Sequence, residues 1–202
     1  MHRSNALAAL TLLCLAGLAG PGLAADKPKA AAASAAAPVW TVDKAASHLR
    51  FRSAFSGMAF EGGFTRWDAQ IAFDPKNLAA SKATVSVDMA SAATGDRDRD
   101  ETLPTGDWFN TAKFPRAVFT TSKITSLGGD RYQAQGTLSM KGAVRPVTLP
   151  FTLTIQGNVA KMSGQTVLNR SQFAVGQGQF AGADAVPLEV TVVISISAKR
   201  AG

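Results

Sequence analysis

The chain has 202 residues, with 21 Lys and Arg against 14 Asp and Glu, and a single cysteine. That cysteine, Cys14, lies in an N-terminal apolar run, so the rest of the chain has no thiol for a disulfide, a thiolate metal site or a nucleophile. The basic excess forms no block with interleaved aromatic residues, which argues against nucleic acid as a partner. A mild attraction to anionic lipid headgroups is compatible with it.

Residues 1–24 have the pattern of an export signal. His2 and Arg3 form a short basic start, residues 6–19 are nearly all apolar, and residues 22–24 supply a cleavage site. A retained membrane anchor is the alternative, but the apolar run is shorter than the roughly 20 residues that a spanning helix needs. The pattern therefore predicts cleavage of this segment and a periplasmic location.

Residues 25–38 are rich in Ala, Pro and Lys and have almost no side chain large enough to bury. They are interpreted as a flexible spacer. An Ala-rich helix is the alternative, although it would be short and would have no apolar face. The remainder, residues 39–202, has the right size for one domain.

Apolar and polar residues alternate along most of this domain, which is typical of half-buried β-strands. Pro150 cannot donate to a ladder, so its strand is predicted to lie at an edge or to be bulged there. Turn signals between the segments favour antiparallel neighbours. About eight such strands form a sandwich or close into a barrel. The expected strands are residues 40–43, 49–55, 64–73, 83–89, 116–124, 132–140, 147–155, 161–168 and 188–197.

Within each strand, the apolar residues lie at every second position and therefore on one face of the sheet. They are the candidates for the inward face. From composition alone, a core filled by side chains is favoured over a cavity. Small residues of the same parity, Ser53, Ala69, Ala134 and Gly136, still leave a case for internal space. The inward-facing candidates are Leu49, Phe51, Phe55, Trp67, Ile71, Phe73, Val85, Val87, Leu138, Met140, Leu149, Phe151, Leu153, Ile155, Val192 and Ile194.

Residues 99–115 interrupt the strand pattern with charges and aromatic side chains. Trp108 and Phe109 bring large apolar area to a short segment. They either seal one end of the fold or border an entrance for an apolar chain, with Arg99 nearby for a polar headgroup. Thr105 or Asp107 is suited to cap a helical turn, so the insert is predicted to contain a short helix.

Residues 96–101 alternate carboxylates and arginines, which raises the question of a cation site. The run lacks the spacing and the central glycine of an EF-hand loop. Because the interleaved arginines neutralise the carboxylates, a solvated or self-paired turn is the favoured interpretation. A partly buried Arg99–Asp100 pair would fix the insert.

Catalytic groups are scarce. His48 is the only histidine after residue 24, so a two-histidine metal site is excluded there. A triad with a serine and an aspartate is formally open, but no G-x-S-x-G elbow accompanies it. The sequence therefore predicts no enzyme, no metal and no cofactor.

Short motifs follow one another in a fixed order across residues 40–199. In that order they resemble the YceI-like family of exported polyisoprenoid-binding proteins. Ser139-Met140 and Ala143 depart from residues that are common in the family but preserve the strand pattern. The motifs are Trp40-x-Val42-Asp43, Ser47-His48-Leu49-x-Phe51, Gly62-Gly63-Phe64, Phe73-Asp74-Pro75, Arg99-Asp100-x-x-Leu103, Asp107-Trp108-Phe109, Phe114-Pro115, Gly136-x-Leu138-x-x-Lys141-Gly142, Arg145-Pro146-Val147 and Arg170-x-x-Phe173.

The resemblance implies an all-β fold: an antiparallel eight-stranded lipocalin-like barrel with a short helical insert. It implies that the interior holds a long isoprenoid chain, of a quinone or a prenyl phosphate, without covalent chemistry, which reverses the preference for a filled core. The inward-facing candidates, Leu49 apart, would line that chain. The candidates for the mouth and the headgroup are His48, Arg99, Asp100, Trp108 and Phe109.

Two other functions stay open. One is an interaction module with a filled barrel, docked on a membrane redox protein such as a b-type cytochrome or on a stress-response partner. The other is a hydrolase that uses His48. Contact with a membrane surface or a membrane protein, and a homodimer, are kept as expectations about partners.

Overall fold

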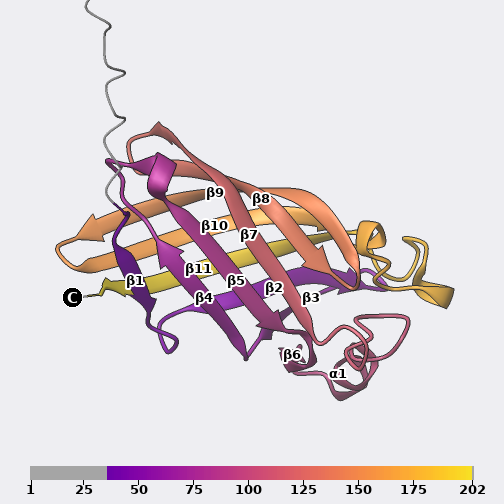
Figure 1. Cartoon of the computed structure of the whole chain (residues 1–202). Helices are drawn as coiled ribbons and strands as arrows, with labels where there is room; N and C mark the ends of the chain where they lie inside the picture. The colour runs from indigo at the N-terminus through magenta and orange to yellow at the C-terminus, as the bar shows by residue number, and fades with distance from the viewer. Residues whose placement is uncertain (1–35, 202) are drawn as a thin grey trace, which may run out of the picture. The chain divides into compact units, whose positions relative to one another are not determined.

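A computed structural model describes residues 36–201 (Figure 1). The expected export signal, Cys14 and most of the expected spacer lie outside the described residues. At the end of the spacer, Ala37 is buried at 7% exposure, and the Pro38 carbonyl accepts the Phe73 N–H at 2.9 Å. These last spacer residues therefore pack as part of the domain. Within the described range, no helix has the length and apolar character needed to cross a membrane.

Strands dominate the domain, with one short α-helix, α1 (Arg97–Thr102), and four 3-10 turns, η1 (Leu78–Ala80), η2 (Met89–Ser91), η3 (Arg170–Phe173) and η4 (Gly178–Phe180). The strands are β1 (Val39–Val42), β2 (His48–Phe55), β3 (Met58–Phe64), β4 (Trp67–Ala72), β5 (Lys82–Asp88), β6 (Ala92–Ala93), β7 (Arg116–Gly128), β8 (Arg131–Met140), β9 (Ala143–Gln156), β10 (Val159–Asn169) and β11 (Glu189–Arg200).

Eight of these strands form a closed antiparallel ring, in the order β1, β4, β5, β7, β8, β9, β10 and β11. The ring closes through β1, because Trp40 is opposite Ile71 of β4 on one side and Arg200 of β11 on the other. Closure leaves these strands without a long open edge. The predicted eight-stranded antiparallel barrel with a short helix is confirmed (Figure 1).

The strand expected at residues 64–73 is shorter in the structure: β4 starts at Trp67, and Phe64 belongs to a separate strand, β3. Ser56 and Gly57 have φ angles of 49° and 80° and form a tight turn, so β3 folds back on β2 and ends at Phe64. The chain then starts again as β4 at Trp67. Positive φ at both central residues suits the twist of a two-residue hairpin. Alternation of apolar and polar residues does not reveal this turn, so β3 was not predicted.

The strand with Pro150 was predicted to lie at an edge or to be bulged there. As a whole it is not an edge strand, and its ladder with β8 shows no register shift at Pro150. Strand β9 pairs with β8 on one side, where Gln133 is opposite Pro150, and with β10 on the other. The ladder with β10, however, ends at Phe151, opposite Gly164. The proline thus lies where one of the two ladders stops, which suits a residue without an N–H.

A register shift between Thr121 and Lys123 changes which residues of β7 face inward. Before the shift, Phe119 and Thr121 line the interior; after it, Ile124 does. Strict alternation would have pointed Lys123 into the barrel. The bulge therefore keeps a cationic side chain out of an apolar interior.

Two hydrophobic clusters occupy the barrel. The first cluster is centred on Trp40, Phe73 and Tyr132. Within it, the Trp40 Nε1–H donates to the Phe73 carbonyl at 2.9 Å. The second cluster includes Phe51 and Phe173, the latter only 1% exposed, and it packs under the segment that contains α1.

Gly136 of β8 gives the first testable consequence. A methyl group there would collide with the Thr120 carbonyl oxygen and approach the Phe119 ring to 2.9 Å. Gly136→Ala is therefore expected to lower the free energy of unfolding by about 1–3 kcal/mol in urea denaturation. Gly106→Ala is the control, because no heavy atom lies within 4 Å of the added methyl. Equal stability of the two variants would contradict this packing.

Candidate functional site

The barrel encloses an apolar cavity of about 320 Å³. Its walls are mostly aliphatic and aromatic side chains, which come from every strand of the ring and from β2 and β3. The lining also includes the polar residues Ser53, Lys82, Thr121, Thr166 and Arg170. Of the residues predicted to line an apolar chain, those on the cavity wall are Phe51, Trp67, Ile71, Phe73, Val85, Val87, Leu138, Met140, Leu149, Phe151, Leu153, Val192 and Ile194.

Two of the predicted lining residues are not on the cavity wall. Phe55 is the last residue of β2, next to the hairpin turn, and is 38% exposed. Ile155 lies near the end of β9 and packs against the first cluster instead. Both have the inward parity, but parity alone does not show where a strand runs past the end of the cavity.

Small residues help to keep the interior open. Ser53, Ala69 and Ala134 line the cavity, in line with the internal space that their parity suggested. Gly136 does not, since the Phe119 ring lies over it. The space that this glycine leaves is therefore occupied by an aromatic side chain.

Several wall residues were missed by the sequence analysis. Phe60 and Phe64 belong to β3, which the unnoticed Ser56-Gly57 turn creates. Ile124 reaches the wall only because of the bulge in β7. A search for two-residue turns would have found Phe60 and Phe64. Strict alternation places Ile124 on the outer face, so the sequence pattern alone does not predict its position.

The cap segment, residues 96–115, covers the end of the barrel where the second cluster lies. The N-cap of α1 is Asp96, which accepts the Arg99 N–H at 3.0 Å. The predicted capping residues, Thr105 and Asp107, do not cap this helix. The predicted Arg99–Asp100 pair is not formed. Arg99 lies 3.4 Å from Asp96 and stacks over the Phe60 ring at 4.7 Å.

Asp100 has a structural role in the cap segment. One of its carboxylate oxygens accepts both the backbone N–H and the hydroxyl of Thr94, each at 2.7 Å. Trp108 and Phe109 both line the cavity, and Phe109 is buried. The aromatic part of the cap segment thus faces the interior, while its charges hold the segment together.

A closing loop, residues 170–188, lies at the same end of the barrel. Its backbone joins the cap segment where the N–H groups of Gly176 and Gln177 donate to the Asp107 carbonyl at 2.8 and 2.9 Å. The Lys141 ammonium connects the cap segment to the closing loop, because it donates to the carbonyls of Gly106 and Ala174 at 2.8 and 2.6 Å.

Arg170 organises the closing loop from inside. Arg170 is 3% exposed and also lines the cavity. Burial lowers the pKa of Arg170 from its ordinary value. The side chain donates five hydrogen bonds of 2.6–3.0 Å to backbone carbonyls, those of Val175, Gly176, Gly182, Val186 and Pro187. All five N–H groups are therefore used in the fold.

A second depression, the polar cleft, lies where β3 and β4 diverge, and has a volume of about 810 Å³. Leu49, Phe64 and Trp67 line both the cleft and the apolar cavity. His48 is exposed in this cleft and is not on the cavity wall, so it does not share a site with the cap segment.

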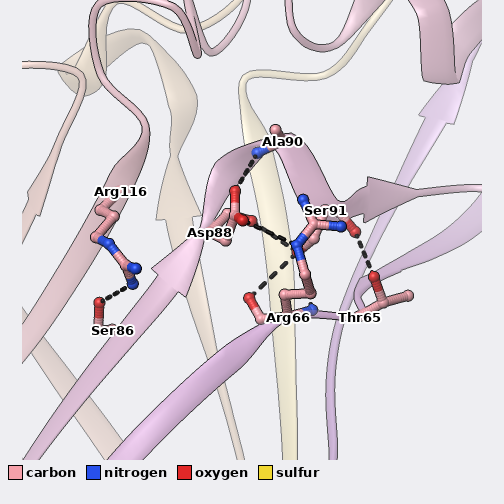
Figure 2. Close-up of polar contacts among 7 residues, drawn as sticks. All are labelled: Thr65, Arg66, Ser86, Asp88, Ala90, Ser91 and Arg116. Carbon is pink, nitrogen blue, oxygen red and sulfur yellow. Dashed lines mark hydrogen bonds and ion pairs between the residues drawn. The ribbon is translucent and has the colours of Figure 1, made fainter.

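Charged side chains line the polar cleft. Figure 2 shows the polar contacts of Arg66, Asp88 and Arg116. Arg66 pairs with Asp88 at 2.9 Å, and Arg116 donates to the Ser86 hydroxyl at 3.1 Å. The Asp88 carboxylate also accepts the backbone N–H of Ala90 at 3.0 Å. In the described part of the chain, no group of three or more His, Cys, Asp or Glu side chains could hold a metal ion.

The barrel and its cavity define a protein class: small antiparallel barrels with an apolar interior, closed at one end by a helical insert and a loop. The chain belongs to the YceI-like family, because the model of the YceI-like domain matches residues 40–198. The resemblance inferred from the sequence motifs is thereby confirmed.

Relatives support the same assignment. Protein YceI of Escherichia coli O157:H7 is 36% identical over 130 residues, which cover 63% of this chain and 68% of the relative. A UPF0312 protein of Yersinia pestis (strain Pestoides F) is 37% identical over 130 residues, which cover 63% of this chain and 67% of the relative.

Solved structures share the fold. BcnA of Burkholderia cenocepacia has a TM-score of 0.75 and 32% identity, over 77% of this chain and 98% of that protein. A polyisoprenoid-binding domain from Saccharophagus degradans has a TM-score of 0.64 over 80% of this chain and 98% of that domain. At 14% identity, the latter likeness concerns the fold alone.

Replacement of Arg170 by lysine tests its role in the closing loop. Lysine has three N–H donors, so at least two of the five carbonyls lose their partner. Arg170→Lys is expected to lower the free energy of unfolding by about 2–5 kcal/mol in urea denaturation. Arg97→Lys is the matched control, because the Arg97 side chain is largely exposed. If both variants were equally stable, the proposed role of Arg170 would be wrong.

The polar cleft yields a prediction about pH. The hydrogen bond from Arg66 is the largest cause that lowers the pKa of Asp88, and the charge of Arg116 is the smallest. Arg66→Gln should therefore raise the Asp88 pKa more than Arg116→Gln does, as measured by carboxyl chemical shifts in an NMR titration. Because the folded-state pKa is lowered, the pair stabilises the fold above the ordinary Asp pKa, and this contribution is lost as pH falls through the folded-state pKa. A larger shift in the Arg116 variant would contradict the assignment.

Proposed function

We propose that this protein is a periplasmic, non-catalytic carrier that holds the chain of an isoprenoid lipid inside its barrel. The observation that carries the proposal is the apolar cavity, which is enclosed by aliphatic and aromatic side chains from all sides of the ring. Membership of the YceI-like family supports a lipid-binding role. A structural neighbour with the same fold is described as a polyisoprenoid-binding domain.

The physical reason for such a carrier is the low solubility of a prenyl chain in water. Moving each CH₂-sized unit from water into an apolar interior gains roughly 0.8 kcal/mol, so a chain of many such units strongly favours the cavity. The Phe, Val, Leu and Ile side chains on the cavity wall have no polar group that would attract water in place of the prenyl chain. The pattern at residues 1–24 supports export, and the scarcity of nucleophiles and histidines supports binding without chemistry.

Extraction of the purified protein tests the proposal. Protein expressed with its own leader in a bacterium should release a prenyl lipid into organic solvent, detected by mass spectrometry. Ala69→Phe should reduce the recovered lipid severalfold, because Ala69 lines the cavity. Gln70→Phe is the control, since this neighbour on β4 is exposed on the outer face.

Two results would count against the carrier. Wild-type protein that is consistently free of prenyl lipid would overturn it. Equal lipid content in the Ala69 and Gln70 variants would show that the lipid lies outside the cavity.

A docking module is the second candidate, favoured by the tip of the β2–β3 hairpin. Phe55 and Met58 are opposite each other there and are 38% and 71% exposed. Such an apolar tip suits contact with a membrane surface or a membrane protein. The extraction separates the two candidates, because a docking module with a filled barrel carries no lipid.

A further inference from the structure

One stretch of the barrel wall lacks the ladder that joins its strands elsewhere. Strand β9 pairs with β8 from its first residue onwards, and β10 pairs with β11 along its whole length. The ladder between β9 and β10, however, stops at Phe151, which is opposite Gly164. Residues 143–150 of β9 and 165–169 of β10 form the seam. In the part of the chain that the structure describes, no ladder pair joins the two sides of the seam.

Prolines on β9 keep the seam from closing as a ladder. The Thr148 carbonyl accepts the Thr166 hydroxyl of β10 at 2.9 Å, so the main chain of β9 points towards β10 at Thr148. In an antiparallel strand this direction repeats at every second residue, which brings Pro146 and Pro150 to the same edge. Neither proline has an N–H to donate. A side-chain hydrogen bond therefore holds the seam, whereas a ladder holds the rest of β9 and β10 together.

The seam is apolar on its inner and its outer side. Val147, Leu149 and Leu168 line the cavity from within. Val144 and Val167 lie on the outer face, and each is 55% exposed. An apolar chain that passes between β9 and β10 would therefore keep apolar contacts on both sides of the wall.

Both ends of the barrel are closed by bonded or packed groups. At one end the cap segment is joined to the closing loop, where the Asp107 carbonyl accepts the N–H groups of Gly176 and Gln177. At the other end the first cluster buries Trp40 and Tyr132, at 5% and 9% exposure. Entry through either end would require these contacts to break.

The polar cleft is the alternative passage through the wall, since it shares three wall residues with the cavity. Its lining, however, includes the Arg66–Asp88 pair and the Lys44–Asp68 pair, the latter at 3.0 Å. A prenyl chain that passed there would take water away from charged groups, which is unfavourable. The seam is therefore the favoured route for an apolar chain.

We propose that the seam is a lateral entrance, through which a prenyl chain enters and leaves the cavity when residues 165–169 part from β9. The proposal rests on the proposed function, because it gives the route of the lipid that the barrel carries. Parting the seam breaks the hydrogen bond between Thr166 and Thr148 and no ladder pair, so it requires less free energy than opening a paired region. The cap segment and the closing loop stay in place.

Thiol crosslinking tests this route, because Cys14 is the only native cysteine. In a Cys14→Ala background, Thr148→Cys and Val167→Cys place thiols at positions that would be opposite each other if the ladder continued. A short bifunctional thiol reagent then locks the seam. Thr154→Cys with Lys161→Cys is the control lock, since the ladder already pairs these two residues.

A third pair, Asp107→Cys with Gln177→Cys, locks the cap segment to the closing loop where their backbones are hydrogen-bonded. Each lock is confirmed by mass spectrometry, and each locked protein is compared with its own untreated form. Uptake and release of a polyprenyl quinone are followed by quenching of tryptophan fluorescence, because Trp67 and Trp108 line the cavity. An equilibrium titration gives the Kd.

The seam lock is expected to slow uptake and release together, each by about tenfold or more, because a closed entrance raises the barrier in both directions. The Kd changes little, since the cavity itself is unaltered. The control lock and the cap lock leave both rates unchanged. Equal slowing of uptake and release at constant Kd is a signature that a purely structural role of the seam would not produce.

A variant without crosslinks tests the seam in the opposite direction. Thr166→Val removes the hydroxyl that joins the two sides and keeps the shape of the side chain. It is expected to speed uptake and release by about two- to tenfold. Thr152→Val is the matched control, because the Thr152 hydroxyl donates to the Ser163 carbonyl at 3.4 Å where the ladder already pairs the strands.

Other results overturn the proposal. Unchanged rates in the seam-locked protein and in Thr166→Val would remove the entrance and leave the carrier function standing. Slower exchange in the cap-locked protein alone would place the entrance at that end. A seam lock that lowered the affinity without slowing release would show that the seam is only a part of the cavity wall. If wild-type protein bound no polyprenyl lipid, the carrier function would fail and the entrance with it.

Discussion

The buried guanidinium of Arg170 fixes the end of the barrel on which the site depends. It gathers five backbone carbonyls of the closing loop, and the loop in turn packs Phe180 against Trp108 of the cap segment. A charge without a carboxylate partner is tolerated there because every N–H donor is satisfied. Without this arrangement, the loop has no means to hold its carbonyls away from water, and the wall of the cavity near Trp108 loses its support.

The cavity itself results from two opposing features of the strands. Eight strands form a ring whose interior is just wide enough for side chains or for one ligand. Aromatic side chains fill part of this interior, as where Phe119 covers Gly136. The small residues Ser53, Ala69 and Ala134 leave space. The bulge in β7 keeps Lys123 outside and brings Ile124 to the wall, so this part of the interior stays apolar.

Periodicity in the sequence was enough to predict the all-β fold and most of the cavity wall, because residues two apart on a strand share a face. It failed where geometry depends on backbone conformation: the Ser56-Gly57 turn hid β3, and Pro150 suggested an edge where one ladder simply ends. Parity also placed Phe55 on the wall, although the cavity stops short of it. The roles of Arg170 and the polar cleft depend on contacts between distant segments, which no local pattern records.

A crystal structure of the protein with a long-chain polyprenyl quinone tests the central claim most directly. The account predicts that the prenyl chain occupies the apolar cavity between the first and second clusters. A chain bound on the outer surface, with an interior closed over by side chains, would contradict it.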